Sequence, residues 1–169
     1  MLNRRDLLKT LTATTVTLQL PAAEPNAPLF FTKDEFALLD ALTEMIVPAD
    51  DHSPGAHEAG VAAYIDKTVA EAFAPDEKTS WRKGLAAINE LSTSLNGKPF
   101  LKTTKQQQAA LLTKIAAAEK DPKTPPERFF TQVKQTTAFA YYTSKIGIHQ
   151  EMNYKGNVPL TQFVGYDAE

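Results

Sequence analysis

The densest group of side chains that could do chemistry in this sequence lies between Asp50 and Glu58. Within these nine residues, His52 and His57 occur together with three carboxylates. Imidazole and carboxylate groups bind divalent metals, so the segment is a candidate metal site. Its spacing matches neither the i, i+4 histidine pair of a zinc-protease helix nor the alternating oxygen ligands of an EF-hand. The same residue types suit a turn and a helix start, with Gly55 at a positive φ, and we favour that structural interpretation.

The rest of the sequence offers no recognised catalytic pattern. The chain has no cysteine, so it can form no disulfide, thiolate metal site, iron–sulfur centre or c-type haem attachment. Its seven glycines include no phosphate-binding loop. His149 stands alone, and the serines lack a nearby His–Asp arrangement that would activate them. We therefore predict no catalytic, cofactor-binding or metal-binding residues in this chain, and a metal-dependent enzyme that uses the Asp50–Glu58 segment is the alternative.

Residues 1–23 have the features of an export signal. Arg4 and Arg5 form a pair, a mildly apolar stretch follows, and small residues end the segment near Ala23. The stretch is too short and too rich in threonine to span a bilayer, so the segment is typical of a cleaved signal peptide of the twin-arginine type. Because that route transports folded proteins, this chain or a bound partner is expected to fold before export, and the expected location is the periplasm.

Composition limits the possible partners. The formal net charge is −2 over 169 residues, and loss of residues 1–23 makes it more negative, because that segment carries three basic residues and one acidic residue. An acidic chain lacks the clustered positive charge that nucleic acids and anionic membranes attract. We expect a single domain with one hydrophobic core and no nucleic-acid partner.

Helical periodicity dominates the sequence from residue 32 to residue 146. The preceding residues 24–31 contain Pro25 and Pro28, so they are expected to form an extended linker. Apolar spacing, capping residues and helix breakers predict five helices inside the helical domain. Their expected bounds are 33–47, 57–73, 75–96, 104–119 and 126–144.

The last segment, residues 147–169, is expected to form a long non-helical C-terminal tail that binds a partner. It contains three glycines and has no clear period, although several apolar side chains occur in it. No part of the sequence alternates as a half-buried strand would. The predicted fold class is therefore all-α, a small irregular bundle of about five helices.

Aromatic residues near the end of the chain exceed what one core-facing helix stripe needs. Tyr and Phe dominate buried contact patches between proteins, so we predict that this surplus contacts a partner. Stacking on sugars is the alternative, which would make the chain a free-standing sugar-binding module. The side chains assigned to the predicted interface are Phe139, Tyr141, Tyr142, Tyr154, Phe163 and Tyr166.

Short motifs that are spread over nearly the whole chain carry a family resemblance. On these motifs the chain resembles the gluconate 2-dehydrogenase subunit 3 family, the small subunits of bacterial membrane-associated FAD-dependent sugar dehydrogenases. The motifs are the twin-arginine pair, Phe30-Phe31-Thr32 with Glu35, Leu42 to Ile46, Val47-Pro48-Ala49-Asp50-Asp51, Pro54-Gly55-Ala56-His57-Glu58-Ala59-Gly60-Val61, Tyr64-Ile65-Asp66, Tyr141 to Ile148, Glu151, Tyr154 to Asn157 and Phe163 to Tyr166.

The resemblance implies a non-catalytic small subunit. Such a subunit pairs with a large flavoprotein of the glucose-methanol-choline oxidoreductase type, which holds FAD, and commonly with a c-type cytochrome, which carries haem c. The resemblance also implies that the small subunit helps the flavoprotein mature and escorts it through the twin-arginine translocase. The expected location is then the periplasm, with membrane association through the partner subunits. The predicted signal agrees, because FAD is inserted in the cytoplasm before export.

Overall fold

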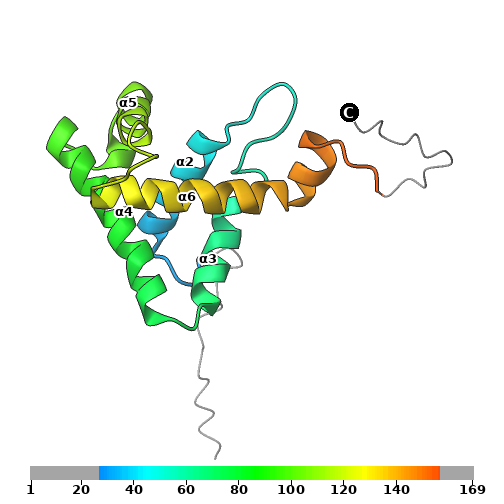
Figure 1. The fold of residues 1–169 in the computed structure, drawn as a ribbon, viewed down its shortest axis with the longest axis horizontal. Helices are drawn as coiled ribbons and strands as arrows, with labels where there is room; N and C mark the ends of the chain where they lie inside the picture. The colour runs from blue at the N-terminus through cyan, green and yellow to red at the C-terminus, as the bar shows by residue number, and fades with distance from the viewer. Residues whose placement is uncertain (1–26, 157–169) are drawn as a thin grey trace, which may run out of the picture.

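The computed structural model describes residues 27–156 of the chain. That part contains five α-helices and no β-strand, so the all-α prediction is confirmed. The helices are α2 (Lys33–Ile46), α3 (Val61–Glu71), α4 (Pro75–Asn96), α5 (Lys105–Ala116) and α6 (Pro125–Tyr142). A 3-10 turn, η1 (Phe100–Lys102), and a π-helical turn, η2 (Gly147–Glu151), complete the described structure (Figure 1). The predicted signal with Arg4 and Arg5, and the predicted interface residues Phe163 and Tyr166, lie outside the described residues.

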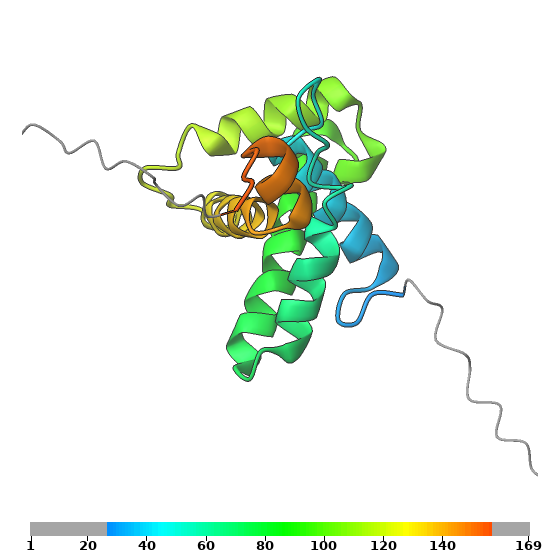
Figure 2. The ribbon, with the colours of Figure 1, turned by 90° about the vertical axis from the view of Figure 1, so that its right-hand side faces the viewer.

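Helix α6 is the centre of the bundle. It packs against α2, α3, α4 and α5, and its C-terminal end continues into η2 (Figure 1). When α6 is viewed nearly end-on, α3 and α4 lie side by side and α5 crosses the opposite side of the bundle (Figure 2). Among the described residues, every helix falls short of the length or the apolarity that a bilayer crossing requires.

Where a local capping signal is present in the sequence, the helix begins or ends close to its predicted position. Thr32 caps α2, since its hydroxyl accepts from the amide of Glu35 at 3.2 Å while the Glu35 carboxylate accepts from the amide of Thr32 at 2.8 Å. Helix α4 runs from Pro75 to Asn96, and Gly97, with a φ of 71°, caps its end in the left-handed conformation. These signals act within a few residues, so the sequence alone is enough to predict them.

Two predicted boundaries are wrong by more than three residues. The second helix begins at Val61 and not at residue 57, because residues 56–60 form turns and Gly60 precedes the helix with a φ of 70°. The tail is not irregular from residue 147, because residues 147–151 form the π-helical turn η2. In the sequence, Gly147 indicates the end of a helix. In the structure, it allows its own backbone to lie close to the carbonyl group of Tyr141, which a Cβ at this position would overlap.

Three aromatic rings and one glycine pack together in the core where α4 crosses α6. The rings of Trp81 and Phe129 meet edge to face with centroids 5.6 Å apart, and Phe31 contacts Trp81 at 6.3 Å. A Cβ on Gly84 would overlap the Phe129 ring, so only glycine allows this crossing. The three aromatic residues are buried and join α4 and α6 to the segment before α2.

Candidate functional site

In the Asp50–Glu58 segment, one of the three carboxylates, that of Asp50, is bonded to the protein's own backbone. Asp50 accepts from the amides of His52 and Ser53, both at 2.8 Å. These two bonds lower the pKa of the Asp50 carboxyl group. Among residues 27–156, no group of three or more His, Asp or Glu side chains is arranged to hold a metal ion. The metal-enzyme alternative therefore has no support from the described residues.

A second carboxylate, from α2, holds the far end of the same loop. Glu44 accepts from the amides of Ala49 at 3.1 Å and His57 at 2.8 Å. A Cβ on Gly55 would lie 2.5 Å from the amide nitrogen of Ala49 and from the Glu44 carboxylate. Gly55 is not among the glycines with a positive φ, so that expectation is wrong. Lack of space, and not backbone conformation, requires glycine at this position.

Tyr141 closes this loop onto α6 from inside the core. Its side chain is only 2% exposed, and its hydroxyl group donates to the carbonyl oxygen of Pro54 at 2.7 Å. The hydroxyl group of Ser53 lies 2.6 Å away and donates to the Tyr141 oxygen, whose single proton is already used. The assignment of Tyr141 to a partner interface is therefore corrected, because its ring belongs to the core of this chain.

His57 joins the loop to α2 through a charged contact. Its Nδ1 atom lies 2.6 Å from the Asp40 carboxylate. The hydrogen bond and the charge of Asp40 raise the pKa of His57 above its ordinary value of 6.5. The imidazole is 71% exposed, so solvent screens this pair and its contribution to stability is small.

We expect the pair to make stability fall as pH rises. The pKa of His57 is higher in the folded state than in the unfolded state. The contribution of the His57–Asp40 pair to stability is therefore fully present below the unfolded-state pKa near 6.5, and it is lost as the pH rises through the folded-state pKa. Urea unfolding between about pH 6 and about pH 9 should show a small decrease in the midpoint. Asp40→Asn should flatten that decrease. An unchanged pH dependence in Asp40→Asn would contradict the assignment.

The most strongly bonded carboxylate of the described structure belongs to Asp66, in α3. This residue is buried, and its carboxylate accepts from three successive backbone amides. These belong to Leu29, to Phe30 at 3.0 Å and to Phe31 at 2.9 Å. We call this arrangement the Asp66 clamp. It ties the segment ahead of α2 to α3, although the two are 35 to 37 residues apart in the chain.

Arg82, in α4, holds the same segment from the other side. Its Nη2 atom donates to the carbonyl oxygen of Phe30 at 2.9 Å, and its guanidinium group lies 4.5 Å from the centre of the Phe30 ring. Residues 29–31, predicted as part of an extended linker, are therefore fastened to two helices. Sequence reasoning missed the role of Asp66. The available signal was its position on the buried stripe of α3, four residues after Ala62 and three before Val69.

The predicted interface residues Phe139 and Tyr142 lie on the outside of α6. Their exposed fractions are 59% and 44%. Tyr64 of α3, which sequence reasoning did not assign to this interface, is 44% exposed, and its ring centroid lies 6.4 Å from that of Phe139. Tyr154, also predicted, is exposed beyond η2. We define the α3–α6 face as Tyr64, Thr68, Thr136, Phe139, Tyr142 and Thr143.

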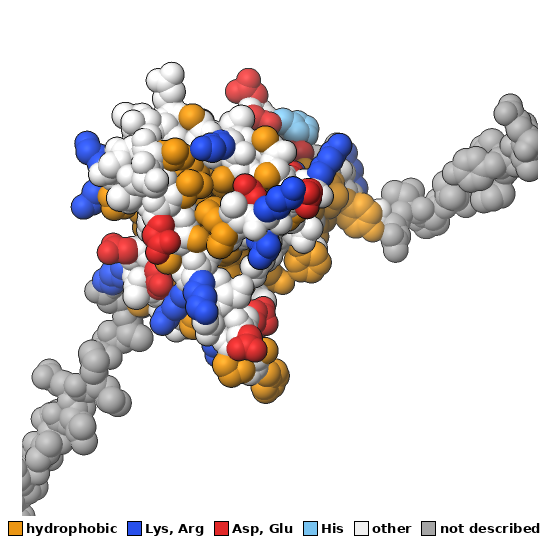
Figure 3. All heavy atoms as spheres, turned by 60° about the vertical axis from the view of Figure 1, so that its left-hand side comes forward, with side chains coloured by type: hydrophobic (Ala, Val, Ile, Leu, Met, Phe, Trp, Pro, Cys, Tyr) orange, Lys and Arg blue, Asp and Glu red, His pale blue; other side chains and the backbone are white. Residues whose placement is uncertain are grey.

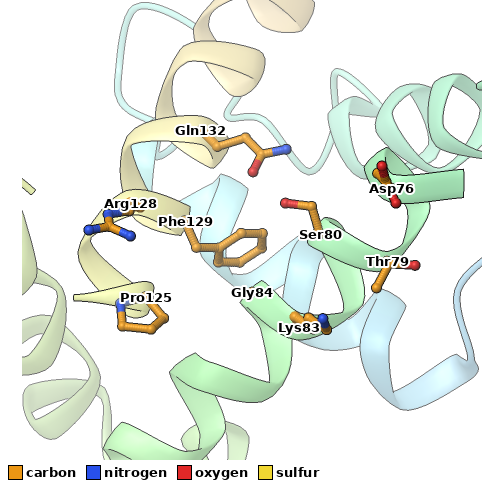
Figure 4. A pocket seen from close by; sticks show the side chains of 9 residues that line it. All are labelled: Asp76, Thr79, Ser80, Lys83, Gly84, Pro125, Arg128, Phe129 and Gln132. Carbon is orange, nitrogen blue, oxygen red and sulfur yellow. The ribbon is translucent and has the colours of Figure 1, made fainter. Parts of the chain in front are cut away.

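A hollow of about 400 Å³ lies where α4 crosses the start of α6. The Phe129 ring and Gly84 lie at its centre, and the side chains of Ser80 and Gln132 extend beside that ring from α4 and α6 (Figure 4). The Phe129 ring occupies the space that a side chain on Gly84 would fill. Ser80 and the nearby Arg128 are exposed to solvent, so the hollow offers no buried polar group that would orient a substrate.

A larger apolar groove of about 770 Å³ runs between α4, α5 and the start of α6. Its lining includes Ala87, Leu91 and Ile115, with Lys83 and Glu90 at its edge. With the α4–α5 side brought forward, hydrophobic atoms gather in the middle of the surface, and side chains of both charges surround them (Figure 3). The groove therefore has a rim that carries charges of both signs.

Fold and site together define a small helical protein whose polar side chains hold its own loops and which exposes Tyr64, Phe139 and Tyr142 on the α3–α6 face. The chain belongs to the gluconate 2-dehydrogenase subunit 3 family, whose model matches residues 33–159. The match includes every helix from α2 to α6, and it confirms the resemblance. The family is one of dehydrogenase-complex subunits. No curated protein and no solved structure matches the chain.

Proposed function

We propose that this chain is the non-catalytic small subunit of a periplasmic FAD-dependent dehydrogenase that oxidises a sugar, a glycoside or a sugar acid. The observation that carries the proposal is the exposed α3–α6 face on a member of a dehydrogenase-subunit family. The buried and paired polar groups support it as well. Asp50, Glu44 and Asp66 are bonded to backbone amides, so they stabilise the fold and are not poised to act on a substrate.

The proposed partner is a large flavoprotein subunit of the glucose-methanol-choline oxidoreductase type, which holds FAD. A c-type cytochrome is the proposed third subunit, and it anchors the complex at the membrane. Because this chain has no cysteine, it cannot attach haem c itself, so that cofactor belongs to another subunit. In this arrangement substrate selectivity lies in the flavoprotein.

The small subunit also escorts the flavoprotein through the twin-arginine translocase. The paired Arg4 and Arg5 support this role, since the route accepts folded cargo that already holds its cofactor. The Asp66 clamp supports it further. It fastens residues 29–31, which follow the predicted leader in the chain, to α3, so this segment is held only when the core is folded.

Co-purification tests the proposal. We expect the isolated mature chain to be colourless and inactive, and to bring down flavin absorbance and dehydrogenase activity only when the proposed flavoprotein subunit is co-expressed. The control is the flavoprotein expressed without this chain, which should yield less soluble, FAD-loaded protein. Stoichiometric FAD bound to this chain alone, or no complex after co-expression, would refute the proposal.

A further inference from the structure

We propose that the α3–α6 face is the surface that binds the flavoprotein subunit, with an uncharged apolar patch of that subunit seated on Tyr64, Phe139 and Tyr142. The inference rests on the proposed function, because it assumes that the flavoprotein is the partner. It adds the location of the contact and the chemistry that the partner must present there.

Aromatic side chains form the centre of this face. Tyr64 and Phe139 come from different helices and contact each other, and Tyr142 follows Phe139 by three residues on the outside of α6. Rings placed in this way have lost part of their freedom before binding, so covering them costs little additional entropy. Tyr and Phe are enriched at the cores of protein interfaces for this reason and for the large area that they bury.

The threonines of the face turn their hydroxyl groups inward. Thr68 donates to the carbonyl oxygen of Tyr64 at 2.9 Å, Thr136 to that of Gln132 at 2.9 Å, and Thr143 to that of Phe139 at 2.7 Å. Each of these three hydroxyl protons is used within its own helix, so burial beneath a partner leaves no threonine donor unsatisfied. The threonines can therefore be covered together with the rings.

Charged side chains are absent from the centre of the face. No charged residue occurs between Lys134 and Lys145 in the sequence, and Lys134 is paired with Glu119 at 2.7 Å. On α3, Lys67 pairs at 3.9 Å with Glu71, one turn beyond Thr68. Depletion of charge at the centre with polar groups at the rim is the typical composition of a protein interface. A highly charged partner surface would pay a desolvation cost here without gaining an ion pair.

The available area favours a larger partner over a second copy of this chain. A ring buries roughly 150–250 Å² when it is fully covered, so three rings that are about half exposed offer roughly 300 Å². A stable interface needs about 800 Å² on each partner. In a two-fold pair, the second copy contributes only the same small patch. A larger subunit can extend beyond the rings to Met152 and Tyr154, which are exposed after η2.

The position at which the described part of the chain ends also supports the flavoprotein as the partner on the α3–α6 face. Turn η2 packs against α6, so the chain leaves the described structure at the end of the helix that carries Phe139 and Tyr142. Thirteen further residues, 157–169, include Leu160, Phe163 and Tyr166. A subunit seated on the α3–α6 face therefore lies next to the point at which the described part of the chain ends.

Charge substitution on the face tests the inference in the full co-expressed complex. We expect Tyr64→Lys with Phe139→Lys to reduce recovery of this chain on a tagged flavoprotein by at least about tenfold, since a buried unpaired charge opposes binding. The matched control is Leu95→Lys with Leu101→Lys, at apolar residues that are 47% and 42% exposed but lie outside the face. The control should retain the complex. Circular dichroism should show unchanged helicity in both.

A photo-crosslinking amino acid at position 139 gives a second measurement that does not depend on how a variant folds. We expect an adduct with the combined mass of this chain and the flavoprotein, and none from position 95. A face variant that folds and still binds, or an adduct only from position 95, would overturn the inference while the proposed function stands. A dimer of this chain alone that Phe139→Lys dissociates would show that a second copy is the occupant. Failure of the wild-type chain to bind the flavoprotein would refute the proposed function itself.

Discussion

Exchange of both Arg4 and Arg5 for lysine is expected to keep this chain and the flavoprotein subunit in the cytoplasm. Lysine preserves the positive charge of the segment, so a loss of export would reflect recognition of the arginine pair and not general electrostatics. The paired arginines are the export address that the sequence offers, and the proposal gives the flavoprotein no other route. We therefore expect periplasmic dehydrogenase activity to fall to background while cytoplasmic activity persists.

The location of the flavoprotein is the decisive measurement. Cell fractions should be assayed for dehydrogenase activity and probed for both subunits, with Lys9→Arg as the control that alters a basic residue of the same segment. Dehydrogenase activity that still reaches the periplasm while this chain stays behind would refute the escort role. Retention of both subunits in the double-lysine variant, together with normal export in the control, would support it.

Replacement of Asp66 by alanine is expected to be the most destabilising single change in the described structure. It removes the acceptor of three backbone amides, of which the Phe31 amide is buried. Hydrogen bonds to a charged acceptor contribute more than neutral ones, and a buried donor without a partner carries a desolvation penalty, so we expect a loss of about 3 to 5 kcal/mol. That is a large part of the stability of a typical domain.

Graded variants separate the clamp from a general effect of charge. Asp66→Asn keeps one oxygen for the Phe30 and Phe31 amides but turns an amide donor toward Leu29, so its loss should be intermediate. Asp51→Ala, at an exposed carboxylate, should change the unfolding free energy by less than about 0.5 kcal/mol. Urea unfolding gives the stability, and limited proteolysis near residue 29 reports release of the segment. Equal stability of Asp66→Ala and wild type would contradict the clamp.

Interactions between near neighbours could be predicted well. The Thr32–Glu35 capping box and the Gly97 cap depend on a few consecutive residues, and the structure has both. Periodicity also identified the helices and placed Phe139 and Tyr142 away from the main buried stripe. The predictions were wrong where a residue contacts an element that is distant in the sequence. Tyr141 carries the same ring as its neighbour, yet its hydroxyl group meets a loop 87 residues earlier in the chain.

The sequence by itself determined the all-α class, most of the helix ends and the family, because capping, apolar period and short motifs are properties of adjacent residues. Only the tertiary structure decided the roles of Asp66, Gly55 and Gly84. Each of these roles depends on a group that is distant in the sequence and becomes a neighbour only in the fold. Asp66 meets three backbone amides, Gly55 meets a carboxylate, and Gly84 meets an aromatic ring. The α3–α6 face is of the same kind. Tyr64 and Phe139 are 75 positions apart in the chain, and the packing of α3 on α6 makes them neighbours.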